Sequence, residues 1–259
     1  MKRRTYRTSQ VAAAVGVHPN TVRLYERYGL LPEIPRTVSG YRQYTEAHID
    51  QMRLARMAFE GLWPGRAIRQ SAVALVKQSA AGDLGGALEM AYRHLAIVQA
   101  ERAQAESAVK LLERWARGTA ADATSRPISI GKVADLLGVS RDMLRNWERN
   151  SLIQVPREPG NGYRVYGAAE IGRLRVIRML SRAGYSTMSI LRMLLCLDYG
   201  ESADLRHVLD TPTTEELEDA GGDVYSAADR WITTLDGWEQ RTHAMIELLE
   251  SMIVRERSL

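Results

Sequence analysis

The chain has 259 residues and a net charge of +4, and its 45% hydrophobic and 25% charged residues are typical of a globular protein with room for two domains. No apolar run reaches the roughly 20 residues that span a bilayer, and no apolar stretch follows the basic start, so we expect a cytoplasmic protein that does not enter membranes. Cys196 is the only cysteine, which excludes an internal disulfide and a paired-thiolate metal site within one chain.

The first part of the chain predicts two short helices and a hairpin. A capped first helix is expected up to Val15, where Gly16 breaks it. Pro19 suits the first turn of a second helix that ends at about Tyr28. Two short helices joined by a tight, glycine-containing turn form a helix-turn-helix. Residues 33–44 are rich in Pro and Gly and predict a two-stranded hairpin, which makes the whole segment a winged helix.

The same pattern occurs a second time at a constant offset of 122 residues. The three blocks Val11–Val17, Arg23–Arg27 and Gly40–Tyr44 recur as Val133–Val139, Arg145–Arg149 and Gly162–Tyr166. The second copy predicts a helix over about Ser140–Asn150 and a hairpin over 155–166. An internal repeat sets the number of functional modules, so we expect two.

Both copies are basic, and the end of the chain is acidic. Residues 1–75 hold 12 Lys and Arg against 5 Asp and Glu, and residues 128–200 hold 11 against 6. Residues 201–259 hold 5 against 14, whereas residues 76–127 are nearly neutral. Positive charge on two duplicated modules predicts a polyanion that contacts both of them.

A long helix is predicted after each copy. Apolar residues follow at alternating spacings of four and three over 83–117, and again from Ala228 to Met252, which is typical of coiled-coil seams. Polar residues occupy two seam positions, Arg102 and Thr242. Because both helices belong to one polypeptide, we expect the seams to be buried against each other within the chain.

Several blocks carry a resemblance to a known family. Val-x-x-x-x-Gly-Val, Arg-x-aromatic-Glu-Arg, Gly-Leu-Leu-Pro and Gly-Tyr-Arg-x-Tyr, followed by a glycine before a fourth helix (Gly61 and Gly184), resemble the DNA-binding domain of MerR-family transcription regulators. The resemblance covers about residues 6–76 and 128–198. Leu24 and Asn146 depart from it where the family usually has a second aromatic residue, and 63–65 lengthen the loop before the fourth helix.

The predicted fold is mainly α, with two winged helix-turn-helix domains that each carry a small β-hairpin wing and are each followed by a long coiled-coil helix. The expected segments are 1–80 for the first DNA-binding domain, 83–117 for the first coiled-coil helix, 118–127 for a linker, 128–200 for the second DNA-binding domain, and 201–259 for an acidic segment with the second coiled-coil helix.

The candidate DNA contacts lie on the second helix and on the wing of each copy. A helix in the major groove presents its N-terminal residues to base edges, and arginines one turn further along reach phosphates or guanine. The wing tyrosines are interpreted equally well as core residues. The candidates are His18, Asn20, Thr21, Arg23, Tyr25, Arg36, Tyr41, Arg42 and Tyr44 in the first copy, and Ser140, Arg141, Arg145, Trp147, Arg157, Tyr163, Arg164 and Tyr166 in the second. The adjacent pairs Glu26-Arg27 and Glu148-Arg149 are interpreted as helix-face ion pairs that orient neighbouring arginines.

These residues predict a sequence-specific DNA-binding transcriptional regulator that clamps two half-sites of a promoter operator. Because 18–21 and 140–143 present different groups, the operator should be an imperfect palindrome, and one chain should occupy it as a pseudo-dimer. The resemblance implies distortion of the spacer DNA and action on RNA polymerase. An architectural or recombination accessory DNA-bending protein, and an antibiotic- or ligand-sequestering regulator, are the alternatives. No cofactor, metal or enzymatic activity is expected, since the five histidines are scattered singly.

Overall fold

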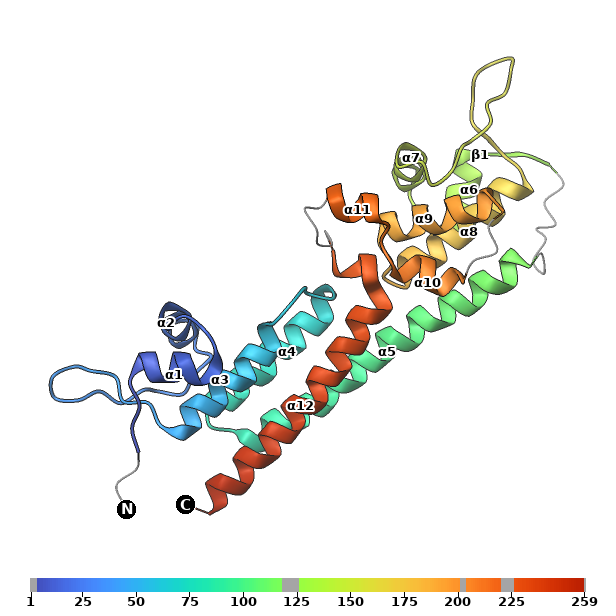
Figure 1. Ribbon diagram of the computed structural model, residues 1–259. Coiled ribbons are helices and arrows are strands. Elements are labelled where there is room, and N and C mark those ends of the chain that lie inside the picture. The colour runs from blue at the N-terminus through green and yellow to red at the C-terminus, as the bar shows by residue number, and fades with distance from the viewer. Residues whose placement is uncertain (1–3, 118–125, 201–203, 220–225, 259) are drawn as a thin grey trace. The chain divides into compact units, whose positions relative to one another are not determined.

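The computed structural model describes residues 4–117, 126–200, 204–219 and 226–258 (Figure 1). Most of the described residues are helical, which confirms the mainly α prediction. The chain divides into two compact units: unit 1 comprises Met1–Ala100 and Asp236–Leu259, and unit 2 comprises Glu101–Leu235. None of the described helices is long and apolar enough to cross a membrane. Most of the predicted linker, residues 118–125, lies outside the described residues.

Unit 1 begins with four helices and includes parts of two longer ones. They are α1 (Thr8–Val15), α2 (Pro19–Arg27), α3 (Glu46–Phe59), α4 (Gly65–Ala80), α5 (Leu84–Ala116) up to Ala100, and α12 (Trp231–Arg257) from Asp236. Gly16 ends α1 in the left-handed region at φ +65°, which glycine adopts without a steric cost. Pro19 occupies the first turn of α2, where a missing N–H is harmless. The two short helices therefore begin and end within about a residue of their expected bounds.

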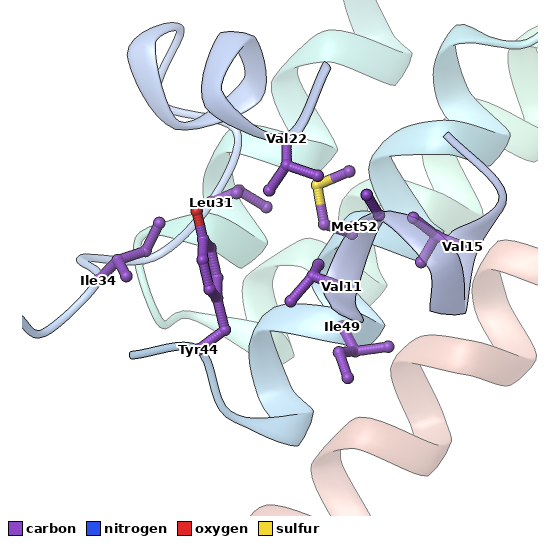
Figure 2. Packing of buried hydrophobic residues seen from close by; sticks show 9 residues of the cluster. Val11, Val15, Val22, Leu31, Ile34, Tyr44, Ile49 and Met52 are labelled. Carbon is purple, nitrogen blue, oxygen red and sulfur yellow. The ribbon is translucent and has the colours of Figure 1, made fainter. Parts of the chain in front are cut away.

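The core of unit 1 lies between α1, α2 and α3. Figure 2 shows its labelled side chains, which are Val11, Val15, Val22, Leu31, Ile34, Tyr44, Ile49 and Met52. All of them are buried. Gln51 ties this core to the next helix, because its buried amide donates to the carbonyls of Leu30 at 3.0 Å and Val76 at 2.9 Å.

The segment between α2 and α3, residues 33–44, contains less strand than predicted. A single bridge joins Arg36 and Arg42, and the end of the segment pairs instead with the start of the chain, through Tyr6 and Tyr44. The Tyr6 N–H donates to the Tyr44 carbonyl at 2.8 Å, and the Tyr44 N–H donates back at 3.0 Å. Pro35 has no N–H, so the segment lacks a donor that a regular ladder requires. The expected hairpin is therefore a narrow loop.

Two long helices pack against each other inside unit 1. The Tyr92 hydroxyl of α5 donates to Glu250 of α12 at 3.2 Å, and the Gln99 amide donates to Glu239 at 2.9 Å, so the helices run antiparallel. Within unit 1, the predicted α12 seam is buried from Trp238 to Met252. Its polar member, Thr242, is satisfied because its hydroxyl donates to the Trp238 carbonyl at 2.7 Å.

The α5 seam differs from the predicted one. The buried positions near the start of the helix are Ala87, Ala91, His94 and Val98, and Leu95 is only partly buried. His94 takes a core position because its Nδ1 lies 2.7 Å from the Ser71 hydroxyl and its ring packs edge-on against Trp238. A strict heptad pattern does not foresee a core histidine whose Nδ1 is paired with a neighbouring helix while its Nε2 is buried without a hydrogen-bond partner among the described residues.

Unit 2 follows the same helix order and adds short elements. They are α5 from Glu101, β1 (Ile128–Ser129), α6 (Ile130–Leu137), α7 (Arg141–Arg149), β2 (Val165–Tyr166), α8 (Ala168–Arg182), α9 (Thr187–Asp198), α10 (Leu205–Asp210), α11 (Thr214–Asp219), the 3-10 helix η1 (Ala227–Arg230) and α12 up to Leu235. The strands β1 and β2 are antiparallel, with Ile128 opposite Tyr166. The expected hairpin over 155–166 is again reduced, to one bridge between Arg157 and Arg164.

The acidic segment after α9 forms a cover for that helix. The guanidinium of Arg192 on α9 is buried, donates to the carbonyls of Val208 at 2.6 Å and Leu209 at 3.1 Å, and pairs with Glu216 of α11. Part of the acidic charge that the sequence places after residue 200 therefore compensates a cation inside unit 2.

Candidate nucleic-acid interface

The two units each contain a four-helix head: α1 to α4 form the first head and α6 to α9 the second. Residues 33–44 are the first wing and residues 155–166 the second wing. In the first head, the fully buried Val22 holds α2 against the core, and the polar residues around it face outward. His18 and Asn20 are exposed and Thr21 is partly buried.

The start of α2 is ordered by its own side chains. The His18 ring accepts a hydrogen bond at Nδ1 from the Asn20 N–H at 3.2 Å and so caps the helix. The exposed Arg23 donates from Nη1 to the Asn20 side-chain oxygen at 3.2 Å. This edge of α2 thus carries one full positive charge beside neutral donors and acceptors.

The start of α7 in the second head has different chemistry. Ser140 caps the helix by accepting a bond from the Met143 N–H at 3.0 Å, and the buried Leu144 takes the place of Val22. Arg145 Nη1 lies 2.9 Å from Asp142 Oδ1, and both side chains are more than half exposed. Arg141 is exposed as well. Of the two arginines at this edge, Arg145 is therefore already paired with an anion.

A glutamate holds the wing arginines in each head. Arg42 Nε lies 2.7 Å from Glu26 Oε2 and Arg36 Nη2 lies 3.5 Å from Glu26 Oε1. In the second head, Arg164 lies 2.6 Å from Glu148 and Arg157 lies 3.7 Å from it. The hydrogen bond to Glu26 raises the pKa of the Arg42 guanidinium above its ordinary value.

This arrangement corrects the expected helix-face pairs with Arg27 and Arg149. Glu26 and Glu148 pair with the wings instead, because each carboxylate points from the second helix toward the loop that follows it. Each group of two arginines and one glutamate keeps a net charge of +1. The sequence does contain a signal for this pairing, because both glutamates and all four wing arginines recur at nearly the same offset.

Three candidate DNA contacts are core residues. Tyr44 and Tyr166 are 0% and 1% exposed, and Trp147 is 6% exposed. The tyrosines end their wings where the chain bridges back to Tyr6 or to β1, so their rings point into the head. Burial raises the pKa of both tyrosine hydroxyls. This burial favours a role in the core of each head for these three residues over direct contact with a partner.

The other aromatic candidates are accessible to different degrees. Tyr41 and Tyr163, at the wing tips, are 75% and 72% exposed. Tyr25 is partly buried, with its ring 5.8 Å from that of Phe59 at the end of α3. The wing tips therefore carry an exposed tyrosine next to each partly buried arginine, Arg42 or Arg164. The described residues contain no group of three or more His, Cys, Asp or Glu side chains placed to hold a metal ion.

Two segments of the chain match models of one protein family. Residues 7–44 match the family described as MerR family regulatory protein, and residues 128–195 match the family described as MerR HTH family regulatory protein. The matched segments contain α1, α2 and the first wing in one case, and α6 to α9 in nearly full length in the other.

Curated relatives agree with these matches. The HTH-type transcriptional regulator HmrR of Rhizobium leguminosarum bv. viciae is 30% identical over 90 residues, which are 34% of this chain and 69% of that protein. The mercuric resistance operon regulatory protein of Bacillus cereus is 39% identical over 51 residues, 20% of this chain and 39% of that protein. A probable heavy metal-dependent transcriptional regulator of Haemophilus influenzae is 32% identical over 71 residues, 27% of this chain and 56% of that protein. The chain thus spans between 39% and 69% of these relatives. No solved structure matches the chain.

Proposed function

The chain belongs to the MerR family of helix-turn-helix regulatory proteins, and from this premise we propose that it is a sequence-specific DNA-binding transcriptional regulator with two tandem heads. One observation carries the proposal. In each head, a short helix anchored by its buried residues, Val22 in α2 and Leu144 with Trp147 in α7, exposes polar side chains at its N-terminus, and its glutamate pairs with two wing arginines. This is the chemistry that reads base edges and binds the flanking phosphates.

The exposed and partly buried candidates then have roles in binding. His18, Asn20 and Thr21 in the first head, and Ser140 and Arg141 in the second, face base edges in the major groove. Arg23 and Arg145 bind a guanine or a phosphate. The wing residues grip phosphates beside the groove, and they are Arg36, Tyr41, Arg42, Arg157, Tyr163 and Arg164. The buried Tyr44, Trp147 and Tyr166 support the heads from inside.

The operator is an imperfect palindrome under this proposal, because the two heads present different groups. Asn20 offers an amide that pairs with adenine, whereas Arg141 offers a guanidinium that suits guanine. Exchanging 18–21 with 140–143 should reverse the preferred orientation of the site. Equal affinity for a perfect palindrome of either half-site would contradict this part of the proposal.

One chain occupies the whole operator. The proposal is supported by the antiparallel contact of α5 and α12 in unit 1 and by the burial of the α12 seam residues from Trp238 to Met252 within that unit. A seam covered within the chain leaves little apolar surface for a second copy. Family membership further suggests that the bound heads distort the spacer between promoter elements and so control RNA polymerase.

Selection of sites from random DNA, followed by footprinting, tests the proposal. We expect two protected half-sites within a promoter spacer and an affinity that falls steeply between about 50 and 200 mM salt. A flat salt response would contradict phosphate binding, and a site outside promoters would favour the architectural alternative. Light scattering should give one chain of 29.0 kDa per duplex. Two chains per operator would show that the repeat builds a homodimer instead.

A further inference from the structure

Unit 1 contains a cavity of about 710 Å³ that none of the proposed DNA contacts lines. Its walls come from the first two turns of α3, the junction of α4 and α5, and the C-terminal end of α12, marked C in Figure 1. Ligand pockets in proteins have volumes of roughly 300–1,000 Å³. The space is therefore large enough for a small organic molecule.

Two polar residues that line the cavity, Gln51 and Ser79, are hydrogen-bonded to each other and to the backbone. Gln51 is fully buried and donates to two backbone carbonyls, while its side-chain oxygen accepts a bond from the Ser79 hydroxyl at 2.6 Å. Pro32, Leu84 and Met252 supply apolar wall surface. A preformed, mainly apolar space of this kind binds a ligand without first paying for its own ordering.

The charged groups around the cavity are mostly acidic. Glu46, Asp50 and Glu256 contribute three carboxylates, and Arg255 contributes one guanidinium. Arg255 Nη2 lies 2.9 Å from Asp50 Oδ2, so its charge is compensated, and Arg53 binds the other Asp50 oxygen at 3.0 Å from outside the lining. The lining has a net charge of −2, or −1 when Arg53 is included.

We propose that this cavity binds an amphipathic organic cation. The apolar body of such a molecule lies against Pro32, Leu84 and Met252, and its charged group lies at the rim beside Glu46 and Glu256, which are both exposed. An anion would meet the excess of carboxylates, and its one guanidinium partner is already bonded to Asp50. This binding does not depend on the proposed action on DNA. The bound molecule would contact both α3 of the first head and the C-terminal end of α12.

Three fluorescent probes of one shape test the charge preference on the full chain: 1-pyrenemethylamine, 1-pyrenemethanol and 1-pyrenecarboxylate. Fluorescence anisotropy at neutral pH should show that the amine binds about four- to twentyfold more tightly than the alcohol, the factor expected from ion pairs with two exposed carboxylates. The carboxylate should bind more weakly than the alcohol. Equal affinity for amine and alcohol, or a preference for the carboxylate, overturns the proposal.

Two matched pairs of variants locate the site. Ala47→Phe fills the cavity from α3 and should weaken amine binding at least about tenfold, since it removes the space, whereas Ala96→Phe, an equally exposed change on α5, should not. Glu256→Gln should weaken it about two- to fivefold, as for an exposed ion pair. Glu247→Gln, the same change on the same helix away from the lining, should leave it unchanged. Should Ala47→Phe misfold, the glutamine pair decides alone, and equal affinities of these two variants place the probe elsewhere and overturn the proposal.

Discussion

The two heads share a scaffold but differ at the edges that face outward. Gly16 and Gly138 turn the chain at nearly the same positive φ, +65° and +58°, and Tyr44 and Tyr166 are equally buried. At the start of the second helix, Arg23 is bonded to a neutral amide, whereas Arg145 is paired with the carboxylate of Asp142. The buried tyrosines and the turn glycines are thus alike in the two heads, whereas the residues at the start of α2 and α7 differ, as expected under the proposal that the two heads contact different sequences.

Each head is also contacted by α12, through a different tryptophan in each unit. In unit 1, the Trp238 indole donates to the Leu62 carbonyl at 3.3 Å, in the loop before α4. In unit 2, the Trp231 indole donates to the Ala183 carbonyl at 2.8 Å, in the loop before α9. Trp63 extends the first of these contacts, with its ring 5.9 Å from that of Trp238. The lengthened loop therefore packs against α12 through Trp63.

Substitution of the buried tyrosine in each head tests whether the two scaffolds are equally stable. Tyr44→Ala and Tyr166→Ala should each lower the free energy of unfolding of their own unit by about 3–5 kcal/mol, as expected for an aromatic core residue. Tyr41→Ala and Tyr163→Ala, the same change on the exposed wing tips, should stay within about 0.5 kcal/mol. Urea unfolding combined with hydrogen exchange of peptides from each unit measures both. A small loss in only one of the two core variants would show that the scaffolds are not equivalent.

The difference at the edges should appear in DNA binding. Arg23→Ala and Arg145→Ala should each weaken operator binding about tenfold to a hundredfold, the usual cost of losing one arginine contact to a base or phosphate. The loss should be larger for Arg23→Ala, because Arg145 has to leave Asp142 before it binds DNA. Gel-shift titrations measure the affinities, with Arg93→Ala on α5 as the control for net charge. A larger loss of affinity for Arg145→Ala would show that Arg145, despite its pairing with Asp142, contributes more to DNA binding than Arg23.

Acid should lower the free energy of unfolding of unit 1 through His94. Burial lowers the pKa of His94 to about 4, so the unfolded chain takes up this proton first as the pH falls. Stability linked to His94 is therefore complete above about pH 6.5 and is lost as the pH falls toward 4. Between pH 7 and pH 5, the wild-type chain should lose about 2 kcal/mol more than His94→Gln, which has no group to titrate.

Urea unfolding at the two pH values gives this difference, and the buried His48 and the carboxylates act equally in both proteins. Equal losses of unfolding free energy in wild type and His94→Gln would show that protonation of His94 does not destabilise the folded state.

The smallest expected effect concerns the carboxylate of the second head. Asp142→Asn removes an anion beside the proposed phosphate contacts and frees Arg145, so operator affinity should rise about fivefold, the scale of one exposed charge interaction. Asn20→Asp places the same anion in the first head and should lower affinity by a similar or larger factor. Titrations at low and high salt check the electrostatic cause, since screening should shrink both effects. Unchanged affinity in Asp142→Asn would mean that Asp142 lies away from the DNA.

The sequence alone determined the features that depend on neighbours along the chain. The ends of α1 and α2 follow from Gly16 and Pro19, because a left-handed turn and a missing N–H act within one turn of a helix. The repeat at an offset of 122 and the blocks that resemble the MerR family are likewise properties of the order of residues. These local rules place the residues at the start of α2 and α7 correctly.

Tertiary structure decided everything that depends on residues brought together from afar. The Gly-Tyr-Arg-x-Tyr block contains two tyrosines, and only pairing with Tyr6 or β1 determines that Tyr44 and Tyr166 are the buried ones. Glu26 could bind Arg27 next to it, yet the fold places the wing arginines against it instead. His94 enters the α5 seam because Ser71 lies opposite. In each case the stabilising contact joins segments at least 10 residues apart. The residue pattern of one segment therefore cannot predict which of its side chains is buried or paired.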